Sequence, residues 1–207
     1  MPNTIDHLIY SAPTLDEGMD KIEARLGTRP HLGGQHANWG THNALLSLGN
    51  TYLEVIAPDP SLPLPPQGLW LAEQFKKPTH LATWVLRTDS IASLQTLALA
   101  NAIGIGEIQE GQRQKADGTW LKWQLTNPYI LPYNGALPFL IDWGASIHPS
   151  ETTPQAGILE GLTIQHPESK LIKEKLEVLK VKVEVQQGAH FALSAVISHK
   201  HGQVILE

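Results

Sequence analysis

Cysteine is absent from all 207 residues, and this absence removes several chemistries at once. Disulfides, thiolate metal sites and a cysteine nucleophile are excluded, and the composition is typical of a reducing compartment. The chain also lacks an excess of basic residues: it has 15 Lys and Arg and 20 Asp and Glu, for a formal net charge of −5. Without an excess of positive charge, we expect no binding to nucleic acid or to an anionic membrane surface.

Long apolar runs are missing as well. None approaches the roughly 20 residues that a membrane-spanning helix needs. The first ten residues, MPNTIDHLIY, lack the basic start, apolar stretch and small-residue cleavage site of a secretory leader. No G-x-S-x-G motif is present, so serine hydrolase chemistry has no support. We therefore expect an unprocessed cytoplasmic protein with no membrane partner.

The residues that are present are enough for a folded enzyme or binding protein. Hydrophobic residues make up 42% of the chain, which supplies a sizeable core. Ten histidines are many for this length, and with the carboxylates they are the evident source of metal ligands.

The pattern of apolar residues predicts a βαβββ unit over residues 1–58. Residues 4–12 alternate as a strand does, and Thr14 begins a helix through the sequence TLDE, which is a capping box. Gly27 ends that helix. Residues 28–35 are predicted as a loop or weak strand, and residues 43–48 and 51–57 as two strands joined by a tight turn.

The same order of elements recurs after a linker. Residues 59–78 are rich in proline and predict a linker with a short helical piece near 69–75. Residues 79–145 repeat βαβββ, with a turn at Asp117 and Gly118, and residues 158–207 form a third, βαβββ-like module. The predicted fold class is α+β, with tandem βαβββ modules.

The stretch from Gly33 to Pro58 concentrates polar residues beside two strands. Glu54 lies in an otherwise apolar strand, where an unpartnered carboxylate would cost several kcal/mol. A cation, a hydrogen-bonding partner or solvent must therefore compensate its charge. A solvent-exposed position on a half-buried sheet is an equally simple interpretation from this stretch alone.

Several of these segments resemble the glyoxalase-like branch of the vicinal oxygen chelate superfamily. They are IDHLIYSAPTLDEG, GGQHANWGTHNALLSLGNTYLEVIAPDP, LATWVLRTDSIASL, KADGTWLKWQL and LPFLIDWG, spread over about the first 145 residues. The resemblance implies paired βαβββ modules whose mixed sheets curl around a cleft. It also implies a divalent metal, held by a His on a module's first strand and a carboxylate on its last.

Carried onto this sequence, the resemblance implies a metal site for Zn, Ni, Mn or Fe. His7 and Glu54 match the ligand positions of the first module, and Asp142 matches the carboxylate of the second, shortened by one methylene. His80 is the remaining candidate, but it does not match in spacing. His7 precedes its helix cap by seven residues, whereas the residue seven before Ser90 is Thr83, so His80 needs a bulge to face the same side.

Substrate contacts are predicted from the same stretch and from the second module. The candidates are His36, Trp39, Thr41, Asn43 and Arg113, with the alternative that residues 36–43 form a loop held by its own hydrogen bonds. Four tryptophans either line the cleft or belong to the core, and four histidines near loops and strand ends are predicted at the surface. The tryptophans are Trp84, Trp120, Trp123 and Trp143; the histidines are His148, His166, His199 and His201.

Two functions follow as hypotheses. The first is a glyoxalase-like metal-dependent enzyme, an isomerase, lyase or dioxygenase acting on a small carbonyl, enediol or catechol-type molecule, with Glu54 as the group that moves a proton. The alternative is a metal-free protein of the same superfamily that binds or sequesters a small molecule. A homodimer formed through the edge strand 203–206 is a further expectation.

Overall fold

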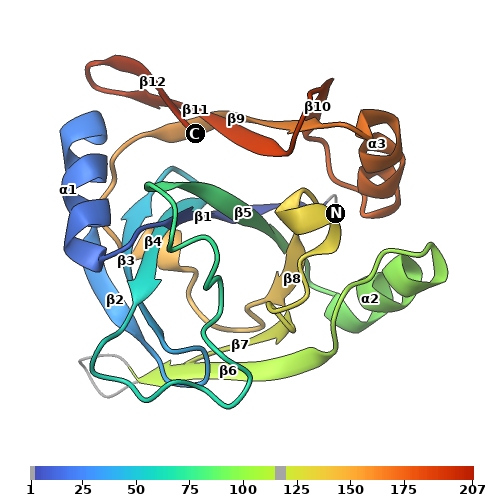
Figure 1. The fold of residues 1–207 in the computed structure, drawn as a ribbon, viewed down its shortest axis with the longest axis horizontal. Helices are drawn as coiled ribbons and strands as arrows, with labels where there is room; N and C mark the ends of the chain where they lie inside the picture. The colour runs from blue at the N-terminus through green and yellow to red at the C-terminus, as the bar shows by residue number, and fades with distance from the viewer. Residues whose placement is uncertain (1–2, 115–119) are drawn as a thin grey trace. The chain divides into compact units, whose positions relative to one another are not determined.

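The computed structural model of this chain describes residues 3–114 and 120–207, with only the backbone at residues 113 and 114 (Figure 1). The chain folds into two compact units built from separate segments. The Glu54 unit comprises His7–Ala82, Pro149–Gly161 and Ser194–Glu207, and the Trp143 unit comprises Met1–Asp6, Thr83–His148 and Leu162–Leu193.

The sheet of the Glu54 unit follows the order β2, β3, β4, β1. Its strands are β1 (Thr4–Ser11), β2 (His31–His36), β3 (Thr41–Ser47) and β4 (Tyr52–Pro58). Antiparallel pairing joins β2 to β3 and β3 to β4, and parallel pairing joins β4 to the His7–Ser11 part of β1. The sheet is therefore mixed, as predicted.

Helix α1 (Leu15–Leu26) covers one face of that sheet, against β3 and β4 (Figure 1). The Thr14 hydroxyl accepts the Glu17 N–H at 3.3 Å, and Gly27 ends the helix with φ 69°. Helix α1 packs tightly at Gly18, because a Cβ added there would lie 2.5 Å from a Val55 methyl and 2.8 Å from the Ala12 Cβ. Val55 therefore faces the helix.

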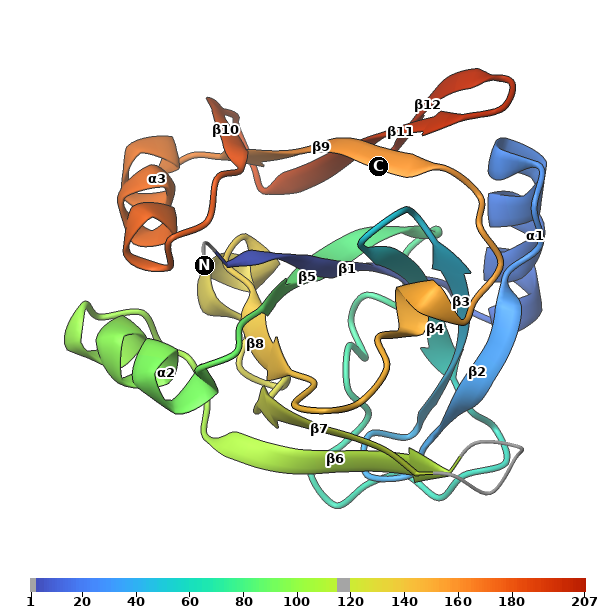
Figure 2. The same ribbon diagram turned by 180° about the vertical axis from the view of Figure 1, so that it is seen from behind.

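The second module repeats this order in the Trp143 unit. The strand order from residue 83 onward is β5, β8, β7, β6, with β5 parallel to β8 and the other pairs antiparallel. Helix α2 contacts β8 and β7, and Figure 2 shows it beside β8. The elements are β5 (His80–Arg87), α2 (Ile91–Ala100), β6 (Ile108–Gln114), β7 (Trp120–Thr126) and β8 (Phe139–Asp142), with a 3-10 turn at Pro132–Gly135.

The third module also has its predicted order of elements. It consists of β9 (Ile158–His166), α3 (Ser169–Val178), β10 (Glu184–Gln187), β11 (Ala192–His199) and β12 (Gly202–Leu206), after a 3-10 turn at Pro149–Glu151. In the Trp143 unit, residues 163–166 of β9 pair with β10 in parallel. In the Glu54 unit, residues 195–199 of β11 pair with β12 in antiparallel fashion.

The predicted α+β class with βαβββ modules is confirmed, but the short helix predicted near residues 69–75 is wrong. Residues 69–75 form successive turns instead of a helix, since Leu71 takes a positive φ of 58° that breaks helical geometry. The predicted turn at Asp117 and Gly118 lies outside the described residues. None of the helices in the described ranges is long and apolar enough to span a membrane.

Candidate functional site

Strand register places Glu54 on the face of its sheet opposite helix α1. Neighbours along a strand point to opposite faces, so Glu54 points away from the face where Val55 meets the helix. Glu54 pairs with Ile9 on β1 and with Leu45 on β3. Paired residues on neighbouring strands share a sheet face, so Ile9 lies on the face of Glu54. His7, two residues before Ile9, lies on that same face.

Glu54 is buried and lies beside His7. The His7 Nε2 is 3.3 Å from the Glu54 Oε2, and the side chains are only 4% and 8% exposed. The His7 ring also stacks on Tyr52, with centroids 4.4 Å apart and an angle of 16° between the planes. This stacking fixes the plane of the imidazole and directs its Nε2 to the carboxylate.

Two further side chains complete the group that we call the Glu54 cluster: Glu54, His7, His36 and Asn43. The Asn43 amide donates to the Glu54 Oε1 at 2.5 Å, and its own oxygen accepts the Gly34 N–H at 2.8 Å. The His36 Nε2 lies 3.9 Å from the same Oε1. Each oxygen of Glu54 thus faces a nitrogen of this cluster.

The cluster keeps Glu54 ionised. Burial raises the pKa of Glu54, but the hydrogen bond and charge of His7, the charge of His36 and the hydrogen bond from Asn43 outweigh burial. The net effect lowers the pKa of Glu54 below its ordinary value of 4.5. Glu54 is therefore a desolvated anion at neutral pH, suited to hold a cation or accept a proton.

The other predicted substrate contacts lie around His36. The His36 Nδ1 is 3.1 Å from the Thr41 hydroxyl, and the Trp39 ring meets the His36 ring edge to face with centroids 5.2 Å apart. The ring centroid of Trp70, a residue of the linker, lies 5.7 Å from that of Trp39. An aromatic wall therefore adjoins the polar cluster. Arg113 has no described side chain, so this predicted contact lies outside what the structure describes.

His80 binds a different set of partners. Its Nδ1 lies 2.8 Å from the Pro78 carbonyl and 3.2 Å from the Ser11 hydroxyl, and its Nε2 lies 3.0 Å from the Gln74 amide oxygen. Burial lowers the pKa of His80, the Pro78 carbonyl raises it, and the charge of Lys77 lowers it, for a net decrease. Both ring nitrogens are thus occupied within the chain.

Register in the second module does not place Asp142 where Glu54 stands in the first. Ile9 lies five residues before the helix cap Thr14 and pairs with Glu54. The residue five before the cap Ser90 is Val85, which pairs with Phe139. Asp142 lies three residues beyond Phe139 on β8, on the opposite sheet face. Its Oδ1 accepts the Gly144 N–H at 2.9 Å.

The residues of the Glu54 cluster fit a metal ion in part. Two ligands about 2.1 Å from one ion lie roughly 3 Å apart, close to the separation of the His7 Nε2 and the Glu54 Oε2. Within residues 3–114 and 120–207, no group of three or more His, Asp or Glu side chains is arranged to hold one ion. Catalytic zinc sites commonly use three protein ligands, so this pair supplies two of that number.

A buried charged network in the Trp143 unit was missed by the sequence analysis. Asp6 is fully buried, and its Oδ2 accepts the Trp143 Nε1 at 2.9 Å and lies 3.1 Å from the His148 Nε2. The Arg87 Nε lies 4.0 Å from the same Asp6 Oδ2. The surface prediction for His148 is wrong, because Asp6 compensates the burial of a polar ring. A charged residue within the apolar strand 4–12 was the available signal.

The remaining tryptophans and histidines divide between core and surface. Trp84 is fully buried and donates to the Ala136 carbonyl at 3.0 Å, so it belongs to the core. Trp120 is 52% exposed. The surface prediction for His166 is also wrong, since this ring is buried and its Nδ1 accepts the Glu168 N–H at 3.0 Å.

Comparison with known proteins agrees with this arrangement of modules. Residues 5–179 match the model of the glyoxalase-like domain family, and the chain therefore belongs to that family, within the vicinal oxygen chelate superfamily that the sequence resembles. A search of curated protein sequences finds no match.

Two solved structures illustrate the likeness of fold. A hypothetical protein from Staphylococcus aureus aligns over 98% of this chain and 84% of its own, with 16% identity and a TM-score of 0.65. A methylmalonyl-CoA epimerase variant from Streptomyces coelicolor, in complex with 2-nitronate-propionyl-CoA, aligns over 70% of this chain and 98% of its own, with 16% identity and a TM-score of 0.50. At such identities the likeness extends to the fold alone.

Proposed function

We propose that this chain is a glyoxalase-like enzyme for a small carbonyl, enediol or catechol-type molecule, with its reacting centre at the Glu54 cluster. The observation that carries the proposal is the 3.3 Å contact between the His7 Nε2 and the Glu54 Oε2, both side chains being more than nine-tenths buried. Burying an anion and an imidazole on the sheet face opposite the helix costs desolvation free energy, and paired buried titratable groups of this kind are typical of functional sites.

Of the four predicted metal ligands we retain His7 and Glu54 as the protein's pair for a divalent ion. The lowered pKa of Glu54 suits this role, because a carboxyl group must be deprotonated to bind a metal. Bound there, such an ion supplies Lewis acidity that stabilises negative charge on a substrate oxygen. Zn, Ni, Mn and Fe all accept an imidazole with a carboxylate.

The other side chains of the cluster position Glu54 and the substrate. Asn43 holds one carboxylate oxygen, so the other is left to His7 or to an exchanging proton. His36 is oriented by the Thr41 hydroxyl and the Trp39 ring, and its charge favours the anionic form of Glu54. We assign Trp39 to the apolar part of the substrate, with the buried Trp70 packed against it.

Proton transfer at Glu54 is testable without knowing the substrate. Small α-hydroxy and α-keto carbonyl compounds in deuterium oxide would be followed by proton NMR, with protein supplied with each of the four metals in turn. We expect the parent to catalyse exchange of the α-hydrogen of one or more of these compounds with deuterium, and Glu54→Gln to slow this exchange by 100-fold or more, since the variant loses both an acid–base group and a metal ligand. Exchange at equal rates in both proteins would refute the role of Glu54.

A metal-free binding protein is the second candidate, and one observation favours it. Among the described residues, no third His, Asp or Glu side chain is arranged with His7 and Glu54 to hold one ion. In that case Trp39 and His36 would hold a small molecule whose binding needs no ion. Retention of ligand affinity in His7→Ala and in the presence of a chelator would support this function over the enzyme.

A further inference from the structure

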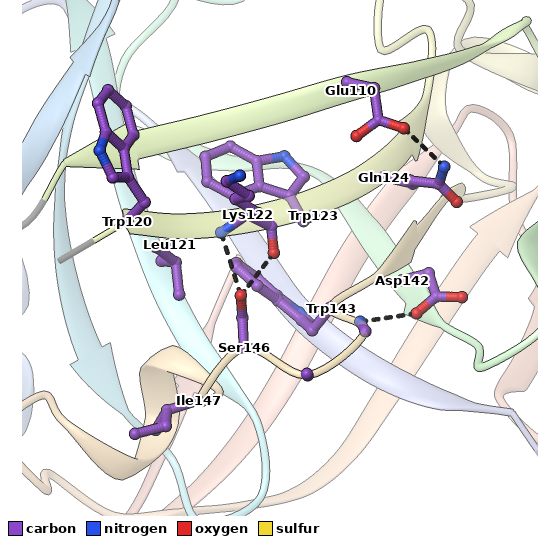
Figure 3. A pocket seen from close by; sticks show the side chains of 12 residues that line it. Glu110, Trp120, Leu121, Lys122, Trp123, Gln124, Asp142, Trp143, Ser146 and Ile147 are labelled. Atoms are coloured by element: carbon purple, nitrogen blue, oxygen red, sulfur yellow. Dashed lines mark hydrogen bonds between the residues drawn. The ribbon is translucent and has the colours of Figure 1, made fainter.

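A cavity of about 640 Å³ lies in the Trp143 unit, beside the part of β7 that extends past β8. Strand β8 pairs with β7 at Gln124 and Leu125, and beyond that point residues 143–147 run next to β7 instead (Figure 3). We call this cavity the tryptophan pocket. It is lined by Glu110, residues 120–124 and residues 142–147.

The wall formed by residues 143–147 is held in place at both ends and in the middle. At the ends, Trp143 and His148 both bond to the buried Asp6 carboxylate. In the middle, the Ser146 hydroxyl donates to the Lys122 carbonyl at 2.8 Å and accepts the Lys122 N–H at 3.1 Å, as Figure 3 shows. The pocket is therefore preformed, which lowers the entropic cost of binding.

One end of the pocket presents apolar and aromatic surface to solvent. Trp120 is 52% exposed and Ile147 is 55% exposed. Trp123, on the other face of β7 from Trp120, contacts Trp143 with ring centroids 5.4 Å apart. Large apolar side chains left exposed around a concavity of drug-like volume are typical of a ligand site. Indole faces favour a flat aromatic ring or a cation.

The other end of the pocket carries two carboxylates. Glu110 accepts the Gln124 amide at 2.8 Å, and Asp142 accepts the Gly144 N–H at 2.9 Å (Figure 3). Each of these bonds occupies one oxygen, and among the described residues the second oxygen of each carboxylate has no partner. Lys122 adds one positive charge, so the ionised side chains of the lining sum to −1. This end favours a positively charged donor.

We propose that the tryptophan pocket binds a small aromatic ammonium compound, with the ring against Trp120 and the ammonium group toward Asp142 and Glu110, which share one face of the sheet with Trp120. The inference rests on the aromatic end, the acidic end and the fixed wall of one preformed cavity. It does not depend on the Glu54 cluster being catalytic.

Isothermal titration with three naphthalene probes tests the charge preference. The probes are 2-naphthylmethylammonium, 2-naphthalenemethanol and 2-naphthoate, which share a ring and differ in charge. We expect the ammonium compound to bind with a Kd below about 1 mM, the alcohol at least fivefold more weakly and the carboxylate more weakly still. Equal affinities, stronger binding of the carboxylate, or no binding of any probe would overturn the proposal.

Two variants and a control locate the binding. Trp120→Ala should weaken the ammonium compound at least tenfold, and Asp142→Asn at least fivefold while leaving the alcohol unchanged. Glu174→Gln, which removes a surface carboxylate on α3 outside the pocket, should change nothing. Binding that survives Trp120→Ala in a folded variant, as judged by circular dichroism, would place the probe elsewhere and overturn the assignment.

Discussion

Glu54 shows how one residue's neighbours decide its chemistry. The sequence places a carboxylate in an apolar strand, and the structure supplies nitrogens from His7, His36 and Asn43 around it. These partners lower the pKa of Glu54 against the opposing effect of burial. The anion is thus maintained by residues from three other segments of the chain, on β1, β2 and β3.

The lowered pKa of Glu54 predicts a specific dependence of stability on pH. A carboxyl whose pKa is lower folded than unfolded stabilises the fold above about pH 4.5, and this contribution disappears as pH falls through the folded pKa. Thermal midpoints of the parent and Glu54→Gln should therefore differ most at pH 6 and converge toward pH 3. The pKa of Asp59 is also lowered, but Asp59 is present in both proteins, so its contribution cancels in the difference between their thermal midpoints. A difference that stays constant or grows on acidification would contradict this account.

Asn43 offers a second test at the same scale. Asn43→Asp keeps the oxygen that accepts the Gly34 N–H but puts a second carboxylate against Glu54. Lost hydrogen bonding and like-charge repulsion should lower the unfolding free energy at pH 7 by about 2 kcal/mol. Urea unfolding measures this loss, and the loss should shrink near pH 4, where the pair can share a proton. Unchanged stability at pH 7 would show that the Asn43 amide is not needed to hold Glu54.

At the scale of elements, most of the fold follows from local patterns. The Thr14 cap, the Gly27 end and the alternation of strands predict α1, β1 and β4 within a residue or two. The turns at 69–75 could not be predicted so easily, because Leu71 has a positive φ of 58°, a conformation that its residue type rarely adopts.

Helix α1 gives a prediction in which packing and propensity oppose each other. Alanine in place of Gly18 should favour an isolated helix by about 1 kcal/mol. A Cβ at this position would lie 2.5 Å from a Val55 methyl, so Gly18→Ala should instead destabilise the protein by about 1–3 kcal/mol. Exposed Ala24→Gly in the same helix is the control and should cost about 1 kcal/mol from propensity alone. Stabilisation by Gly18→Ala in urea unfolding would show that the helix moves away freely.

At the scale of the whole molecule, the repeat preserves architecture and not chemistry. The second-module positions that match His7 and Glu54 in spacing and register are Thr83 and Phe139, neither of which is a metal ligand of the predicted kind. The family resemblance implied Asp142 as a carboxylate on the last strand of the second module, and His80 is the histidine on that module's first strand, at an offset that does not match His7. Only the strand pairing shows that Asp142 is three residues from the matching place, since β8 follows a loop with a 3-10 turn at Pro132–Gly135 whose path the sequence pattern does not predict.

The candidate site was therefore predictable in the first module and less so in the second. Glu54, His36 and Asn43 lie on consecutive antiparallel strands, so their meeting follows from alternation and strand register. His7 joins them through the parallel pairing of β1 with β4, and the family resemblance is what pointed to it. The Asp6 network joins residues about 140 positions apart, and nothing local in the sequence indicates that pairing. The cytoplasmic location and the homodimer stay predictions from the sequence.

The asymmetry between modules predicts a single metal equivalent. His80→Ala and Asp142→Asn should leave metal content unchanged, because His80 is occupied by chain partners and Asp142 is not at the matching register position. Inductively coupled plasma mass spectrometry of each purified variant measures this directly. Loss of metal in either variant would show that the substituted residue is a metal ligand and would contradict this prediction.

The most direct test of the central claim is the metal content of untagged protein incubated with Zn, Ni, Mn or Fe(II) and then desalted. We predict about one equivalent of one of these ions in the parent and in His31→Ala, a control at an exposed histidine, and less than about a tenth of that in His7→Ala and Glu54→Gln. An equal metal content in all four proteins, or no retained metal with any ion, would contradict the assignment of His7 and Glu54 as the metal-binding pair.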